Sequence, residues 1–249
     1  MKRTNSSAIS LLHSARWWWK EKARRDGRIA ATRALFALLA EFARDSTPAR
    51  RRARFGDADF DWEHRVNTTS GAVYWRDRLL GAFHSPYQPT EAALFHEMMM
   101  ALSAQPGFDF PGFTFIDLGS GKGRTLLMAS DYAFRRIVGV ELLPALHGVA
   151  RENLSKYSNQ AQKCFTLESI CMDATEFAFP FEPIVLFLFN PLPEFGLRKV
   201  VENLRASLRE HPRKIYVVYH NPELGVVLNE CDAMERIGGT HQYAIYGSR

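Results

Sequence analysis

A ten-residue segment, FIDLGSGKGR at residues 115–124, holds the residues best suited to bind a ligand. A predicted buried strand ends near Asp117, and Gly119, Gly121 and Gly123 then turn the chain into a helix. Glycine suits such a turn because it tolerates positive φ and lets a ligand approach closer to the backbone than a Cβ would allow. The spacing therefore predicts a ligand-binding turn between a strand and a helix.

Two phosphate-binding loops have similar patterns, and each is excluded by one residue. A P-loop requires Ser or Thr after its Gly-Lys pair, but Lys122 is followed by Gly123. A dinucleotide fingerprint that starts at Gly119 requires a glycine at position 124, where Arg124 stands. The remaining pattern, D-x-G-x-G-x-G, requires neither a phosphate-binding lysine nor the last dinucleotide glycine.

Two acidic residues follow at the ends of later predicted strands. Glu141 ends the second strand, 24 residues after Asp117, where a carboxylate can accept hydrogen bonds from both hydroxyls of a ribose. Asp173 follows the third strand within CMDATEF, residues 171–177. The position of Glu141 predicts a ligand that contains a ribose.

The glycine turn, Glu141, Asp173 and the order of elements over residues 85–246 resemble the class I S-adenosylmethionine-dependent methyltransferases. The resemblance implies S-adenosylmethionine as the cofactor, with Asp173 against the adenine amino group, and no metal site. The cofactor-binding residues that it implies are Asp117, Gly119, Ser120, Gly121, Gly123, Glu141, Asp173 and Ala174.

The segment LFNPLPEF, residues 188–195, resembles motif IV of that family, which lies where the methyl group is presented. Asn190 and Pro191 are present, but Leu192 and Pro193 stand where many amino-group methyltransferases have Pro and an aromatic residue. The missing aromatic disfavours the stacking of a flipped base. One hypothesis is that the Asn190 amide orients an acceptor nitrogen, with Pro191 beside it. The alternative is a turn that proline merely stiffens.

Several further residues have two interpretations each. SPYQPTE, residues 85–91, resembles a segment of some seven-strand protein-lysine methyltransferases, which would place Tyr87 and Thr90 at the cofactor or acceptor pocket; otherwise it is a proline-rich turn. His220 is either a proton acceptor or an incidental loop residue. Arg124 opposes the dipole of its helix, so it has either an acidic partner or a solvent-exposed side chain. We expect Lys122 to point to water.

Strand and helix patterns alternate from residue 91 onward, and the central strands are apolar on both faces. This predicts an α/β fold: a Rossmann-like, doubly wound, mostly parallel seven-stranded sheet with helices on both faces and a terminal antiparallel pair. The predicted helices lie at about 91–103, 124–134, 144–157 and 195–210, with a shorter one after 220. The predicted strands lie near 113–116, 136–142, 165–171, 184–190 and 214–220, followed by the antiparallel pair around 235–246.

The charge distribution divides the chain. Residues 1–54 hold 14 Lys and Arg against 4 Asp and Glu, whereas the remainder holds 18 against 23. We therefore expect a basic N-terminal extension at 1–54 with one amphipathic helix at 28–44, an irregular lid or linker at 55–90, and a methyltransferase domain at 91–249. The amphipathic helix would have Leu35, Leu38, Leu39 and Phe42 on one face.

These observations favour an enzyme that methylates a nitrogen, with a protein amine such as lysine as the expected acceptor. The alternatives are an RNA or DNA methyltransferase, for which the tail with Trp17, Trp18 and Trp19 among basic residues would supply phosphate and base contacts, and a cofactor-binding module without catalysis. The basic tail suits contact with an acidic partner. Three cysteines without a C-x-x-C pair and no transmembrane run predict a cytoplasmic protein.

Overall fold

A computed structural model describes residues 11–45, 58–69 and 88–249, and the chain divides into two compact units. One unit comprises residues 1–55 and 70–87, and the other comprises residues 56–69 and 88–249. Residues 58–69, expected to be irregular, contain a helix, α4 (Ala58–His64), and belong to the same unit as the sheet. Tyr87 lies outside the described residues.

The N-terminal unit contains two helices, α1 (Leu11–Asp26) and α2 (Arg28–Asp45), which pack on each other. α2 matches the predicted helix, but α1, which carries the three tryptophans, was not predicted. The Trp19 indole donates to Thr32 Oγ1 at 3.1 Å, so this ring joins the two helices. Leu39, one of the four apolar residues named for this helix, is 39% exposed. No helix among the described residues is long and apolar enough to cross a membrane.

The sheet has seven strands in the order β3-β2-β1-β4-β5-β7-β6. The first five strands pair in parallel, and β7 pairs antiparallel with both β5 and β6. This arrangement confirms the predicted fold class. The strands are β1 Thr114–Leu118, β2 Arg136–Glu141, β3 Leu167–Cys171, β4 Ile184–Leu188, β5 Ile215–His220, β6 Met234–Gly239 and β7 Tyr243–Ser248.

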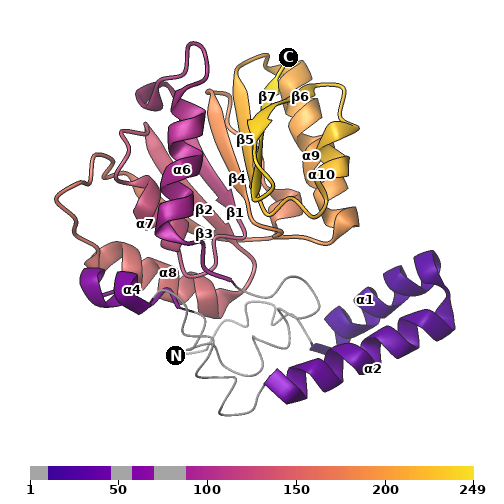
Figure 1. The fold of residues 1–249 in the computed structure, drawn as a ribbon. Coiled ribbons are helices and arrows are strands. Elements are labelled where there is room, and N and C mark those ends of the chain that lie inside the picture. The colour runs from indigo at the N-terminus through magenta and orange to yellow at the C-terminus, as the bar shows by residue number, and fades with distance from the viewer. Residues whose placement is uncertain (1–10, 46–57, 70–87) are drawn as a thin grey trace, which may run out of the picture. The chain divides into compact units, whose positions relative to one another are not determined.

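Helices cover both faces of the sheet, α6 and α7 on one and α9 and α10 on the other (Figure 1). Along β4, Ile184, Leu186 and Leu188 face α9 and α10, whereas Val185 and Phe187 face α6 and α7. This alternation explains why the central strands are apolar throughout. The helical segments are α6 Ala92–Ser103, η2 Phe110–Gly112, α7 Arg124–Ala129, α8 Pro144–Lys156, η3 Ala174–Glu176, α9 Glu194–Glu210 and α10 Gly225–Asn229.

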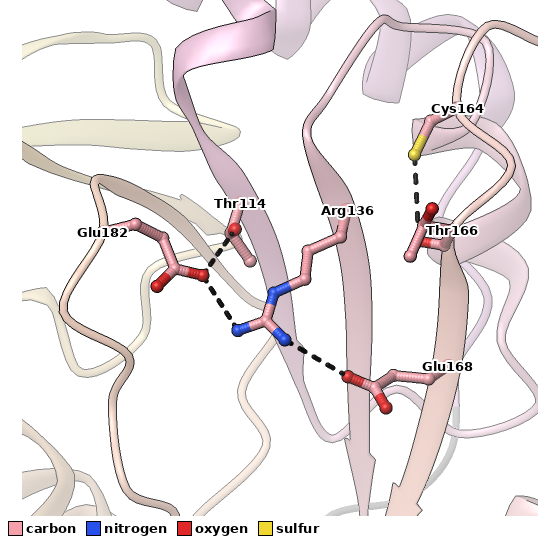
Figure 2. Close-up of polar contacts among 6 residues, drawn as sticks. All are labelled: Thr114, Arg136, Cys164, Thr166, Glu168 and Glu182. Carbon is pink, nitrogen blue, oxygen red and sulfur yellow. Dashed lines mark hydrogen bonds and ion pairs between the residues drawn. The ribbon is translucent and has the colours of Figure 1, made fainter.

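A polar cluster ties the amino ends of the central strands together (Figure 2). Glu182 accepts hydrogen bonds from Arg136 at 2.8 Å and from Thr114 Oγ1 at 3.0 Å, and Arg136 also lies 3.8 Å from Glu168. Arg136 and Thr114 begin β2 and β1, so the cluster lies at the end of the sheet opposite the glycine turn. We assign it to stability and not to the candidate site.

Candidate functional site

The glycine turn adopts backbone conformations that few other residues could adopt. Gly119, Gly121 and Gly123 have φ of 82°, 54° and 82°. A Cβ on Gly119 would also lie 2.6 Å from Pro191 Cβ, which leaves no room for a side chain. The turn after β1 and the Asn190-Pro191 turn after β4 are therefore in contact, although 72 residues separate them in the sequence.

Three backbone N–H groups of this turn are directed to β2. Those of Gly119 and Ser120 donate to the Val140 carbonyl oxygen at 2.8 and 3.1 Å, and that of Gly121 donates to Glu141 Oε2 at 2.8 Å. Loops that bind phosphate leave such N–H groups free for the ligand. This turn does not, which agrees with the exclusion of both phosphate-binding loops from the sequence.

Glu141 is buried beside the turn at the carboxyl end of β2. Its carboxylate accepts the Gly121 N–H and, through Oε1, the Leu143 N–H at 2.7 Å. A carboxylate has about four acceptor positions, so these backbone donors leave acceptor capacity for a hydroxyl group of a ligand. Burial raises the pKa of Glu141, opposed by these backbone hydrogen bonds.

Asp117, near the end of β1, and Ser120, in the turn, have side chains directed inward. Asp117 is buried and accepts a hydrogen bond from the Thr125 hydroxyl. Burial, helped by nearby Glu141, raises the pKa of Asp117 to about 7. The Ser120 hydroxyl lies over Gly139, and it is one of the few buried side-chain polar atoms in the described part of the chain without a hydrogen-bond partner.

Asp173 and Ala174 follow β3 at the same edge of the sheet. The Met172 N–H donates to the Glu141 carbonyl oxygen at 3.1 Å, which brings the end of β3 beside Glu141. Asp173 caps η3 by accepting the Thr175 N–H at 2.8 Å, and Ala174 is buried. The structure thus gathers the predicted cofactor-binding residues at the carboxyl ends of β1, β2 and β3.

Asn190 lies two residues after β4, with a left-handed φ of 44°. Its Nδ2 donates to the Asn221 carbonyl oxygen at 2.9 Å, and its Oδ1 accepts the Tyr219 hydroxyl at 2.8 Å. Sequence reasoning missed Tyr219 and Asn221. The sequence feature that could have identified them is a second Asn-Pro pair, Asn221-Pro222, which follows β5 as Asn190-Pro191 follows β4.

Thr90 and His220 come together near this turn, although 130 residues separate them in the sequence. Thr90 Oγ1 lies 3.4 Å from His220 Nδ1, and both residues are buried. The ring of Phe189 lies against that of His220, with centroids 3.9 Å apart. Burial lowers the pKa of His220 to about 4, so its ring is neutral near pH 7.

The expectation for Lys122 is wrong. The side chain is fully buried and donates from Nζ to Asn67 Oδ1 at 3.0 Å and to the Thr69 carbonyl oxygen at 2.5 Å. A lysine in a glycine turn ordinarily points to water, but residues 65–69 cover this one. Asn153 of α8 joins the same cluster, accepting the Asn67 N–H at 2.9 Å and donating to the Lys122 carbonyl oxygen at 2.9 Å.

Arg124 is also buried, so the solvent-exposed interpretation is excluded. Its guanidinium lies 4.4 Å from the ring centre of Phe60 and donates to Thr68 Oγ1 at 3.3 Å. Asp61 accepts the N–H groups of Thr68 and Thr69 and closes this segment on itself. We call residues 58–69 the clasp, because they hold both basic residues of the glycine turn.

No protein-family model matches the chain, and no curated protein matches it. Among solved structures, it is similar to an RNA methyltransferase from Salinibacter ruber in complex with S-adenosyl-L-homocysteine. The two sequences are 23% identical, the TM-score is 0.39, and the match covers 65% of this chain and 92% of that chain. The rRNA methyltransferase aviRa from Streptomyces viridochromogenes has 12% identity, a TM-score of 0.45 and coverage of 66% and 86%. The glycopeptide N-methyltransferase MtfA has 13% identity, a TM-score of 0.47 and coverage of 66% and 91%.

The mostly parallel seven-stranded sheet, the antiparallel pairing of β7 and the glycine turn after β1 are those that the sequence resemblance implied. This chain has the fold of the class I S-adenosylmethionine-dependent methyltransferases.

Proposed function

We propose that this protein is an S-adenosylmethionine-dependent methyltransferase that methylates a nitrogen atom. The observation that carries the proposal is the glycine turn, where the Gly119, Ser120 and Gly121 N–H groups are bonded to β2 while the buried Glu141 carboxylate keeps acceptor capacity for a ligand. Such a site suits the ribose of a nucleoside without phosphate. S-adenosylmethionine is such a nucleoside, and when bound it supplies a methyl group on a sulfonium sulfur.

The residues present fit this cofactor. Glu141 would hold the ribose hydroxyls, and Asp173 with Ala174 would hold the adenine. Gly119 has no space for a Cβ and touches Pro191, so a ligand on the turn would lie next to Asn190. Asn190 would accept a hydrogen bond from the acceptor N–H and aim the nitrogen lone pair at the methyl carbon, which is catalysis by orientation.

We propose a protein amine, such as a lysine side chain, as the acceptor. The negative balance of residues 55–249 suits a basic substrate. A Cβ on Gly196 of α9 would lie 3.2 Å from Leu192 Cβ. The Leu192 side chain is therefore directed to this helix.

The test combines binding and transfer. Glu141→Ala is expected to weaken S-adenosylmethionine binding by about 1 to 3 kcal/mol, because hydrogen bonds to a charged group are lost. Isothermal titration calorimetry of the full chain measures this, and Glu152→Ala, a surface residue of α8, is the matched control. Unchanged affinity in Glu141→Ala, or a preference for NAD, would refute the cofactor assignment.

The acceptor class is tested by transfer of tritiated methyl groups from S-adenosylmethionine to a cell lysate that is then divided between protease and nuclease. Label that protease removes and nuclease leaves supports a protein acceptor. The opposite result would favour a nucleic acid methyltransferase, and tight cofactor binding without any transfer would favour a cofactor-binding module without catalysis.

A further inference from the structure

Two Asn-Pro turns lie side by side at the carboxyl ends of β4 and β5. Asn190 and Asn221 have φ of 44° and 48°, the left-handed region that non-glycine residues seldom occupy. Such conformations persist only where surrounding contacts fix them, and they concentrate at functional sites. The contact that joins the two turns is the hydrogen bond from Asn190 Nδ2 to the Asn221 carbonyl oxygen.

The orientation of the Asn190 amide is fixed by a partner whose own role is unambiguous. The Asn221 carbonyl oxygen only accepts, so the NH₂ group must face it. Oδ1, which only accepts, is therefore on the side of the Tyr219 hydroxyl, and the hydroxyl must donate. The phenol oxygen lies 2.8 Å from Oδ1, with its proton directed to that atom.

Tyr219 is fully buried on β5, so it contacts no acceptor molecule itself. Burial raises the pKa of Tyr219 to about 12, which keeps the phenol protonated and able to donate. One lone pair of Asn190 Oδ1 is occupied by this bond, and the second stays available for an acceptor N–H. Without the phenol, the amide keeps one fixing contact and can rotate away from the acceptor.

We propose that Tyr219 is a positioning residue that fixes the Asn190 amide for the acceptor nitrogen, an inference that rests on the proposed function. Asn221 provides the second fixed point through its carbonyl oxygen. The paired Asn-Pro turns and Tyr219 thus form one unit that spans the ends of two neighbouring strands.

The first experiment needs no methyl acceptor. In the ¹⁵N-labelled full chain, the Asn190 side-chain NH₂ signals are identified by their absence in Asn190→Ala, and their hydrogen exchange is measured. Tyr219→Phe is expected to increase the exchange rate by about fivefold to tenfold, the scale of one lost hydrogen bond. Tyr246→Phe, a buried tyrosine whose hydroxyl bonds to the Gly225 carbonyl oxygen, is the matched control and should leave this rate unchanged.

If Tyr219→Phe does not fold, 3-fluorotyrosine placed only at position 219 tests the same bond in the opposite direction. Fluorine makes the phenol a stronger donor and keeps the ring in place, so the Asn190 NH₂ group should exchange more slowly. An exchange rate that neither change at position 219 alters would overturn the proposal, whatever the methyl acceptor is.

The second experiment measures tritiated methyl transfer to the lysate proteins at saturating S-adenosylmethionine. Tyr219→Phe should lower the rate by about tenfold, since a small misplacement of an orienting group has effects on this scale, and leave cofactor affinity unchanged. In an Asn190→Ala background the same change should have no further effect. An equal loss of transfer rate in both backgrounds would show that Tyr219 does not act through Asn190. If the wild type transfers no methyl group, the proposed function is contradicted, and the exchange experiment alone tests the role of Tyr219.

Discussion

Replacing Lys122 by methionine would test whether the clasp holds the glycine turn. Methionine keeps most of the length and volume of the side chain but removes the ammonium donor. The variant loses the hydrogen bonds to Asn67 Oδ1 and to the Thr69 carbonyl oxygen. The Thr69 carbonyl belongs to a residue that is 8% exposed, so little water can replace the lost donor.

The expected loss in the free energy of unfolding is about 2 to 4 kcal/mol. This range is the cost of leaving two acceptors without a charged donor. It is reduced by a partial gain, because the variant no longer has to bury an ammonium group away from water. Lys122 lies between Gly121, which donates to Glu141, and Gly123 at the start of α7. A looser turn should also weaken S-adenosylmethionine binding, by about tenfold, because the site is no longer preorganised.

Urea unfolding followed by circular dichroism gives the stability change, and calorimetry gives the affinity. Lys156→Met is the matched control: Lys156 pairs with Glu152 on the surface of α8, and its loss should change stability by about 0.5 kcal/mol or less. Lys122→Met with the stability and affinity of the wild type would refute the role of the clasp.

Three further outcomes follow from the site and the sheet. Burial raises the pKa of Asp117 from 3.8 to about 7, so between these pH values the folded state keeps a proton that the unfolded state has lost. The free energy of unfolding should therefore fall as pH rises from about 4 to about 7. Thermal unfolding of Asp117→Asn over this pH range should not show this dependence. Asn190→Asp places a carboxylate oxygen against the Asn221 carbonyl, so methyl transfer in the lysate assay should be no better than in Asn190→Ala, and better transfer would contradict the assigned amide orientation. Glu182→Gln should weaken the ion pair with Arg136 and cost about 1 kcal/mol in urea unfolding without changing cofactor affinity.

The sheet and the backbone of the glycine turn were predictable because their signals are local. Proline at position 144, the three glycines after Asp117 and the apolar run of β4 each determine backbone conformation within a few residues. Even there, α7 ends at Ala129 instead of near 134, because the last residues of the expected helix form turns before β2.

The environments of Lys122 and Arg124 were not predictable from the glycine turn alone. Their partners, Asn67, Thr69 and Thr68, come from a segment more than 50 residues earlier that has no sustained periodicity. The same holds for the amide of Asn190, whose contacts come from the next strand. Burial of a polar side chain depends on what packs over it, and a single sequence does not contain that pairing.

The clasp also has a consequence for the order of events during synthesis. Asn67 leaves the ribosome 86 residues before Asn153, its partner on α8. At roughly 5 to 20 residues per second, this delay is about 4 to 17 seconds. Phe60, 8% exposed in the folded protein, has no Arg124 to pack against for most of that time. The nascent chain therefore presents an aromatic, incompletely folded segment to chaperones and proteases for seconds before the glycine turn exists to receive it.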